Sequence, residues 1–163
     1  MGKARSYEII EYRKKIFQAI VDSPELVKLL GEEDSEDPAE TIPYNKSFPH
    51  EFVPDTITST DKYVNFDMVA YLDTKNNVFK DITVYFYVVC HKAVVRMDKH
   101  SLDLWYDKVT CALDDIFSQS DILGIGNTMQ LVSNVPYLPH KDFKGRLLKF
   151  TVKDFKNGAK YGA

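Results

Sequence analysis

Residues 63–72 read YVNFDMVAYL and residues 78–91 read VFKDITVYFYVVCH, and these two stretches decide the fold. Apolar and polar residues alternate along both, and a period of two is typical of strands with one buried face. The intervening DTKNN, residues 73–77, has the composition of a turn. The sequence therefore predicts a long antiparallel hairpin. Its buried face is made of Val64, Phe66, Met68, Ala70, Leu72, Ile82, Val84, Phe86, Val88 and Cys90.

The second face of the hairpin is also rich in large side chains. Tyr85, Tyr87 and Val89 alternate there with the buried residues of the second strand. A face of this composition is not simply solvated. We expect a helix or a partner molecule to cover it.

Helical periodicity appears on both sides of the hairpin. Residues 6–30 repeat apolar positions every three or four residues, and Ser23-Pro24 divides them into a long helix and a short one that Gly31 ends. A second helical region spans 101–117, with Ser101 as its cap. Two closing strands are expected at 128–135 and 145–154, joined by a proline-containing loop, and a further short strand at 93–97 is possible.

These elements predict one domain over residues 1–163. Its parts are a helical region at 6–30, an acidic loop and extended arm at 31–60, a sheet with the second helix at 61–155, and a flexible tail at 156–163. The predicted fold class is α+β, with a mostly antiparallel sheet packed by an N-terminal helix and a second helix. The glycines of residues 124–126 are assigned to turn geometry.

Charge and cysteine content exclude several classes of protein. The formal net charge is −3, so broad attraction to nucleic acid is not expected. The longest apolar run, Val84 to Cys90, is too short to span a bilayer, and no signal peptide is recognised at the N-terminus. Both cysteines, Cys90 and Cys111, lie in apolar runs and are predicted to be buried free thiols.

Two segments before the hairpin have unusual compositions. Residues 31–40 hold six acids and no base, which is typical of a solvated loop. Residues 41–60 contain three prolines within twelve positions, which exclude a regular helix or a central strand. Aromatic residues in the same stretch predict an extended arm that packs either on its own sheet or on a neighbouring subunit. The candidate interface residues are Tyr44, Phe48, Phe52, Tyr85, Tyr87 and Tyr137.

The sequence offers little that would carry chemistry. No catalytic, metal or cofactor site is predicted, and adjacent Cys90 and His91 point to opposite faces of a strand. A metal-dependent nuclease is the alternative from another class of protein. Its candidate residues would be Asp67, Asp73, Asp81 and Lys92. Basic and aromatic residues mix weakly in 140–146 and 153–160, where a charge-balanced surface is favoured over a nucleic-acid contact.

Three stretches carry a resemblance to known proteins: YFYVVCHK at 85–92, LDDIF at 113–117 and FTVKDFKNG at 150–158. They resemble proteins from the structural gene blocks of tailed phages and prophages. The order of elements over about residues 6–155 is similar to that of the tail-terminator and neck-completion family.

The resemblance implies a structural virion protein and no enzyme. Such a protein would form a ring, typically a hexamer, that caps the tail tube and joins the tail to the portal, adaptor or stopper proteins of the neck. It would be made in the host cytoplasm, need no cofactor or membrane, and meet genomic DNA only as the DNA passes through its channel. The candidate channel-lining acids are Glu32, Glu33, Asp34, Glu36 and Asp37. A head–tail adaptor or stopper and a host-directed binding module are the alternatives.

Overall fold

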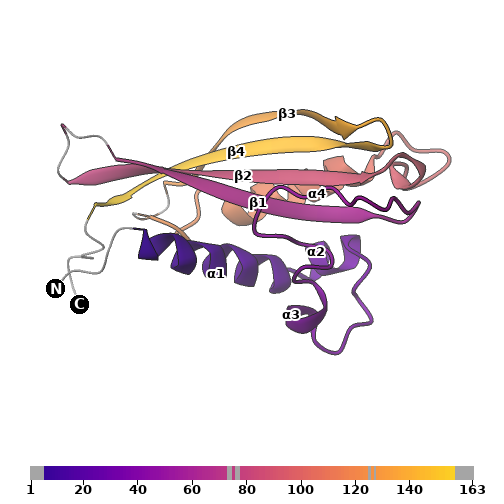
Figure 1. The fold of residues 1–163 in the computed structure, drawn as a ribbon, viewed down its shortest axis with the longest axis horizontal. Helices are drawn as coiled ribbons and strands as arrows, with labels where there is room; N and C mark the ends of the chain where they lie inside the picture. Colours follow the sequence, from indigo (N-terminus) through magenta and orange to yellow (C-terminus); the bar gives the residue numbers. More distant parts are fainter. Residues whose placement is uncertain (1–5, 73–74, 76–77, 125, 127, 157–163) are drawn as a thin grey trace.

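The computed structural model describes residues 6–72, 75, 78–124, 126 and 128–156. Its elements follow the order α1 (Tyr7–Val21), α2 (Pro24–Leu29), α3 (Pro38–Thr41), β1 (Lys62–Tyr71), β2 (Phe79–His91), η1 (Lys92–Val94), α4 (Trp105–Phe117), β3 (Gln130–His140) and β4 (Phe143–Phe155). The strands form one antiparallel sheet in the order β1-β2-β4-β3 (Figure 1). The predicted α+β class is confirmed.

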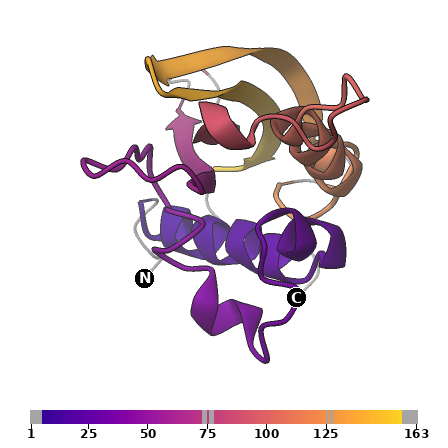
Figure 2. The same ribbon diagram turned by 90° about the vertical axis from the view of Figure 1, so that its right-hand side faces the viewer.

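The hairpin of β1 and β2 places its alternating apolar residues on one face, as predicted, except for Leu72. That residue lies beyond the end of β1 and is 43 % exposed, so its assignment to the buried face is wrong. Val64 pairs with Val88 and Phe66 with Phe86, and all four side chains are fully or almost fully buried. Full burial of such a side chain contributes about 1.5–3 kcal/mol. Helices α1 and α4 pack on this inner face and α2 packs against both of them, while residues 43–61 run along the other side of the sheet (Figure 2).

The two N-terminal helices divide where the sequence predicts. The Ser23 hydroxyl accepts a hydrogen bond from the Leu26 amide at 3.3 Å and begins α2. Gly31 then has a φ of +77°, the left-handed conformation that ends a helix. Within the predicted acidic loop, a short helix α3 begins at Pro38, because the Asp37 carboxylate caps the Ala39 amide at 3.1 Å.

Two elements between β2 and β3 differ from prediction. The possible strand at 93–97 is wrong: residues 92–94 form the 3-10 helix η1, capped by the His91 ring nitrogen, which accepts from the Ala93 amide. The second helix begins at Trp105 and not at Ser101, whose hydroxyl accepts from the Asp103 amide in a separate turn.

The predicted loop around residues 136–144 is largely strand. β3 continues through Pro136 and Pro139 to His140, and β4 begins at Phe143. Proline is tolerated here because β3 is an edge strand that pairs with β4 alone. Gly145 lets β4 approach β2: a Cβ on this residue would lie 1.7 Å from the Val88 carbonyl oxygen.

The remaining local predictions have mixed outcomes. Gly124 and Gly126 have positive φ values, which confirms their role in turn geometry. Cys90 is buried as expected, but Cys111 is exposed because it lies off the apolar stripe of α4. Lys156, assigned to a flexible tail, is buried, and its amide donates to the Val78 carbonyl at 2.8 Å. The rest of that tail, residues 157–163, and most of the predicted 73–77 turn lie outside the described residues.

Candidate subunit interface

The arm, residues 43–61, packs on its own sheet. The Val64 and Phe66 amides of β1 donate to the Lys46 and Phe48 carbonyls, each at 3.0 Å. The Ser47 hydroxyl is buried and donates to the Val64 carbonyl at 2.6 Å. The arm therefore covers the outer edge of β1 along its first half. Of the two alternatives, its own sheet or a neighbour, the structure shows the first.

One buried amide holds the arm in place. The Asn65 side chain accepts from the Phe48 amide at 3.1 Å and donates to the Phe52 carbonyl at 3.0 Å. Asn65 itself is 0 % exposed. Strand alternation places Asn65 on the hairpin face opposite Val64 and Phe66, but it does not predict this role. The sequence signal for this role is an amide side chain between Val64 and Phe66 in an apolar strand. A polar side chain that is buried in a strand needs hydrogen-bond partners.

An ion pair joins the arm to the first helix. The Arg13 guanidinium lies 2.9 Å from the Asp67 carboxylate of β1 and also donates to the Pro49 carbonyl of the arm. Both charged side chains are about one-third exposed, so water weakens the pair. Arg13 thus connects α1, β1 and the arm at one point.

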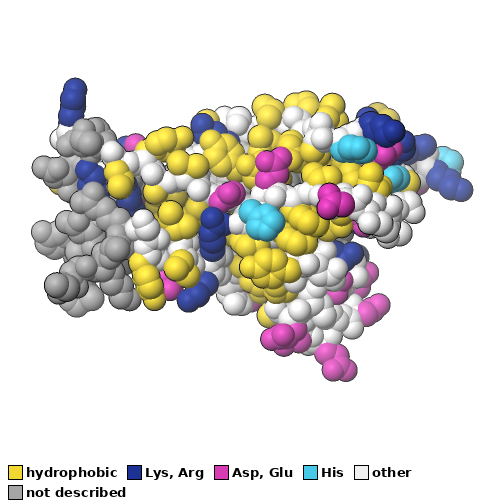
Figure 3. Space-filling view, in the orientation of Figure 1, with side chains coloured by type: hydrophobic (Ala, Val, Ile, Leu, Met, Phe, Trp, Pro, Cys, Tyr) yellow, Lys and Arg dark blue, Asp and Glu magenta, His cyan; other side chains and the backbone are white. Residues whose placement is uncertain are grey.

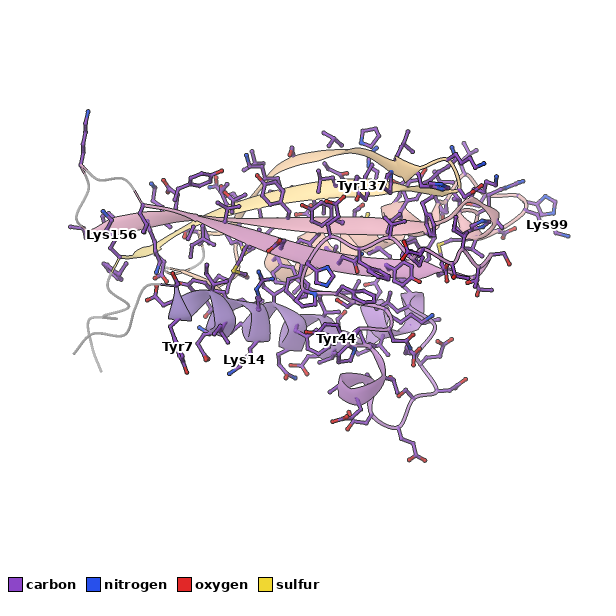
Figure 4. The ribbon with its side chains drawn as sticks, viewed as in Figure 1. Tyr7, Lys14, Tyr44, Lys99, Tyr137 and Lys156 are labelled. Atoms are coloured by element: carbon purple, nitrogen blue, oxygen red, sulfur yellow. The ribbon has the colours of Figure 1, made fainter. Side chains whose placement is uncertain are left out.

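The aromatic residues of the arm and of the sheet form two adjoining groups. In the first, the Phe48 and Phe52 rings stack with centroids 3.8 Å apart, and both rings contact Tyr63 at the start of β1. Tyr44 lies at the margin, with its ring 6.0 Å from Phe48. Figure 4 shows Tyr44 beside the end of α1.

The second group lies on the strands. The Tyr87 ring lies 6.4 Å from Tyr85 on the same strand and 5.5 Å from Tyr137 on β3. The Tyr137 hydroxyl donates to the Glu51 carboxylate of the arm and so joins the two groups. Burial and this hydrogen bond raise the pKa of Tyr137, and burial raises that of Tyr87, so both phenols are neutral at physiological pH.

Together the two groups make one continuous surface, which we call the aromatic surface: Tyr44, Phe48, Phe52, Tyr85, Tyr87 and Tyr137. The six predicted interface residues are therefore brought together. Tyr44 is 67 % exposed, and the other five are partly buried. Apolar neighbours on the edge strand extend the surface, with Val135 43 % and Leu138 66 % exposed. Figure 3 shows hydrophobic side chains gathered along the strands of the sheet.

The predicted channel-lining acids lie elsewhere. Four of the five, Glu33, Asp34, Glu36 and Asp37, are exposed, and Glu32 is partly buried. They belong to the connection between α2 and α3, which projects from the lower side of the molecule in Figure 3. The Asp37 side chain is the N-cap of α3. The structure thus separates these acids from the aromatic surface.

The residues considered for a nuclease do not meet. Asp67 pairs with Arg13, Asp81 with Lys153 at 2.9 Å, and Lys92 with Asp142 at 2.7 Å. Because Asp81 pairs with Tyr71, it lies four positions along β1 from Asp67, or about 13 Å at strand spacing. Lys92 follows the opposite end of β2. Asp73 lies outside the described residues. Among the described residues, no three His, Cys, Asp or Glu side chains group as metal ligands.

Comparison with known proteins places the chain in a phage lineage. The YomW family model matches residues 23–152, from the N-cap of α2 to near the end of β4, and the chain belongs to this family. The family derives from the yom region of SPbeta-like Bacillus phages, so this is a phage protein. No curated protein and no solved structure matches it. In the part of the chain that the structure describes, no helix combines the length and apolar character needed to cross a bilayer.

Proposed function

We propose that this phage protein is a structural, non-catalytic subunit of the virion neck or tail, of the tail-terminator kind. Copies of it would form a ring at the head-proximal end of the tail tube and contact the portal, adaptor or stopper proteins above. The observation that carries the proposal is the aromatic surface. Within the described residues, no helix packs over it, although α1 and α4 cover the opposite face of the same sheet.

The composition of the surface favours contact with protein. Aromatic side chains offer large, rigid contact area with few rotatable bonds, and Tyr is enriched among the residues that dominate binding energy. The tyrosines of β2 and β3 are half-buried and fixed by contacts with one another. A rigid, preorganised patch loses little entropy when a partner binds.

The arrangement of surfaces favours a ring. The aromatic surface is formed by the arm and the sheet, whereas the outer side of α1 and the α2–α3 connection present different chemistry. A contact between two different patches of the same chain is head-to-tail, and such contacts close into rings when the rotation permits. Size and stoichiometry follow from that rotation; a hexamer is the expected number from the resemblance to tail terminators.

Particles made without the protein test the proposal. A phage with the gene deleted is grown and its lysate is imaged by negative stain. A terminator role predicts overlong tails or tails without heads, because nothing stops tube growth or joins the tail to the connector. Particles of normal length and normal head attachment would contradict the proposal.

Complementation of the deletion tests the surface. A Tyr85→Ala/Tyr87→Ala variant is expected to fold, because both rings lie on the outer face of the sheet and outside the main core, but to leave the tail defect uncorrected. Tyr71→Ala is the matched control: Tyr71 lies on the same face of the sheet, is 56 % exposed, and is outside the aromatic surface. The control is expected to restore normal particles. Equal rescue by both variants would exclude the aromatic surface as the interface.

A further inference from the structure

One end of the molecule gathers positive charge from two distant parts of the chain. Residues 91–100, which follow β2, and residues 140–146, at the β3–β4 turn, lie side by side: the Lys92 amide donates to the Asp142 carbonyl at 2.8 Å, and the His91 and Phe143 rings are 6.0 Å apart. Figure 3 shows Lys, Arg and His side chains gathered at this end, and Figure 4 shows Lys99 at its tip.

We call these two segments the basic end. They contain three histidines and only two acids, Asp98 and Asp142. Their lysines and arginines are Lys92, Arg96, Lys99, Lys141, Lys144 and Arg146. Of these six cations, Lys92 alone forms an ion pair with a described residue, at 2.7 Å from Asp142. Most of the positive charge of the basic end is therefore without an ion-pair partner among the described residues.

A second segment carries the opposite charge. Residues 32–40, the acidic segment, contain six acids and no base. None of the six forms an ion pair with a described residue, and five of them are exposed. The segment projects below α1, whereas the basic end extends beyond the strands, so the two are separate projections of one molecule (Figures 1 and 3).

We propose that the basic end of one copy docks on the acidic segment of the next copy in the assembly. This inference rests on the proposed function, which requires contact between copies, and names a charged contact within it. The argument for a second copy as the occupant is complementarity: the acidic segment offers six acids and the basic end five cations that form no ion pair with described residues. The contact joins unlike patches, so it is head-to-tail, as ring closure requires.

The contact should depend on ionic strength. Exposed charges act over about 8 Å at physiological salt and much less at high salt. Sedimentation velocity of the wild-type protein should therefore show self-association that weakens at least about tenfold between about 50 mM and about 500 mM NaCl. Self-association that does not respond to salt, or a monomer at every concentration in low salt, would overturn the inference.

Charge reversal in both partners gives the sharper test. Lys141→Glu/Lys144→Glu and Asp34→Lys/Glu36→Lys change exposed side chains that form no ion pair with described residues. Each double variant alone should self-associate at least about tenfold more weakly than wild type. In an equimolar mixture, the unaltered basic end of one variant meets the unaltered acidic segment of the other, so mixed pairs should form with an affinity within about threefold of wild type. Failure of the mixture to associate would overturn the inference.

A control variant tests whether the effect depends on the site of the charge change, and a DNA-binding assay tests nucleic acid as the rival ligand of the basic end. Lys14→Glu/Lys15→Glu makes the same change in net charge on the exposed side of α1 and should leave association unchanged. Fluorescence anisotropy with duplex DNA tests the rival ligand: DNA binding lost in Lys141→Glu/Lys144→Glu, with self-association intact, would assign the basic end to nucleic acid. If the reversals have no effect while particles lacking the protein are still defective, the charged contact fails and the neck or tail role stands.

Discussion

Replacing Asn65 by alanine should loosen residues 48–52 of the arm from the sheet. The substitution removes both hydrogen bonds by which the side chain holds the Phe48 amide and the Phe52 carbonyl, at 3.1 and 3.0 Å. Each such bond contributes about 1 kcal/mol net. The side chain is fully buried, so its loss also leaves a small cavity. We expect a destabilisation of about 2–3 kcal/mol, or a fall in Tm of about 4–10 °C for a chain of this length.

The loss should be local as well as global. Hydrogen exchange of the Phe48 amide should accelerate more than that of the core strand β2, because the arm opens without unfolding the sheet. Asn134→Ala is the matched control: Asn134 is exposed on β3 and accepts from Arg146 at 2.7 Å, and its replacement should cost less than about 0.5 kcal/mol. Equal stability of the two variants in urea, or unchanged exchange at Phe48, would refute the role given to Asn65.

Three further results are expected. Gly145→Ala should destabilise by more than about 3 kcal/mol or prevent soluble expression, because its Cβ would lie 1.7 Å from the Val88 carbonyl oxygen; a wild-type urea midpoint would contradict this close approach. In thiol labelling of the native protein at mildly alkaline pH, exposed Cys111 should react rapidly, and buried Cys90 only at the rate of unfolding; simultaneous reaction of both would show that Cys90 is accessible. Burial raises the pKa of Cys90 and of Tyr63 to about 12 each, above their ordinary values of 9.0 and 10.0. The folded state therefore holds these protons more tightly than the unfolded state. The stability that the neutral groups contribute is complete below about pH 9 and is lost as the pH rises toward 12. Urea midpoints that stay constant from about pH 8 to 12 would contradict this expectation.

The hairpin and the helices could be predicted because their signals are local. Alternation along β1 and β2 requires only that one face be buried, and Ser23 with Gly31 marks helix ends by backbone chemistry alone. The apolar run around Cys111 predicts burial, and this prediction is wrong because its helical position is off the apolar stripe of α4. At this position the 3.6-residue period of the helix, and not the local apolar run, decides burial.

Features that depend on tertiary structure could not be predicted. Pro136 and Pro139 indicate a loop in sequence, and only the position of β3 at the sheet edge makes them compatible with a strand. The destination of the arm depends on Asn65, whose partners are 13 and 17 residues away. The six aromatic residues of the candidate interface were identified by composition, but their union into one surface follows from the pairing of β2 with β4 and β4 with β3.

The most direct test of the proposed neck or tail role is to locate the protein in the intact phage particle. Purified particles are labelled with a gold-conjugated antibody against the protein and imaged by electron microscopy. The account predicts label at the junction of head and tail. Quantitative mass spectrometry of the same sample should give a copy number per particle that fits one ring. Particles that contain no copy of the protein, or carry it only away from the neck and tail, would contradict the central claim.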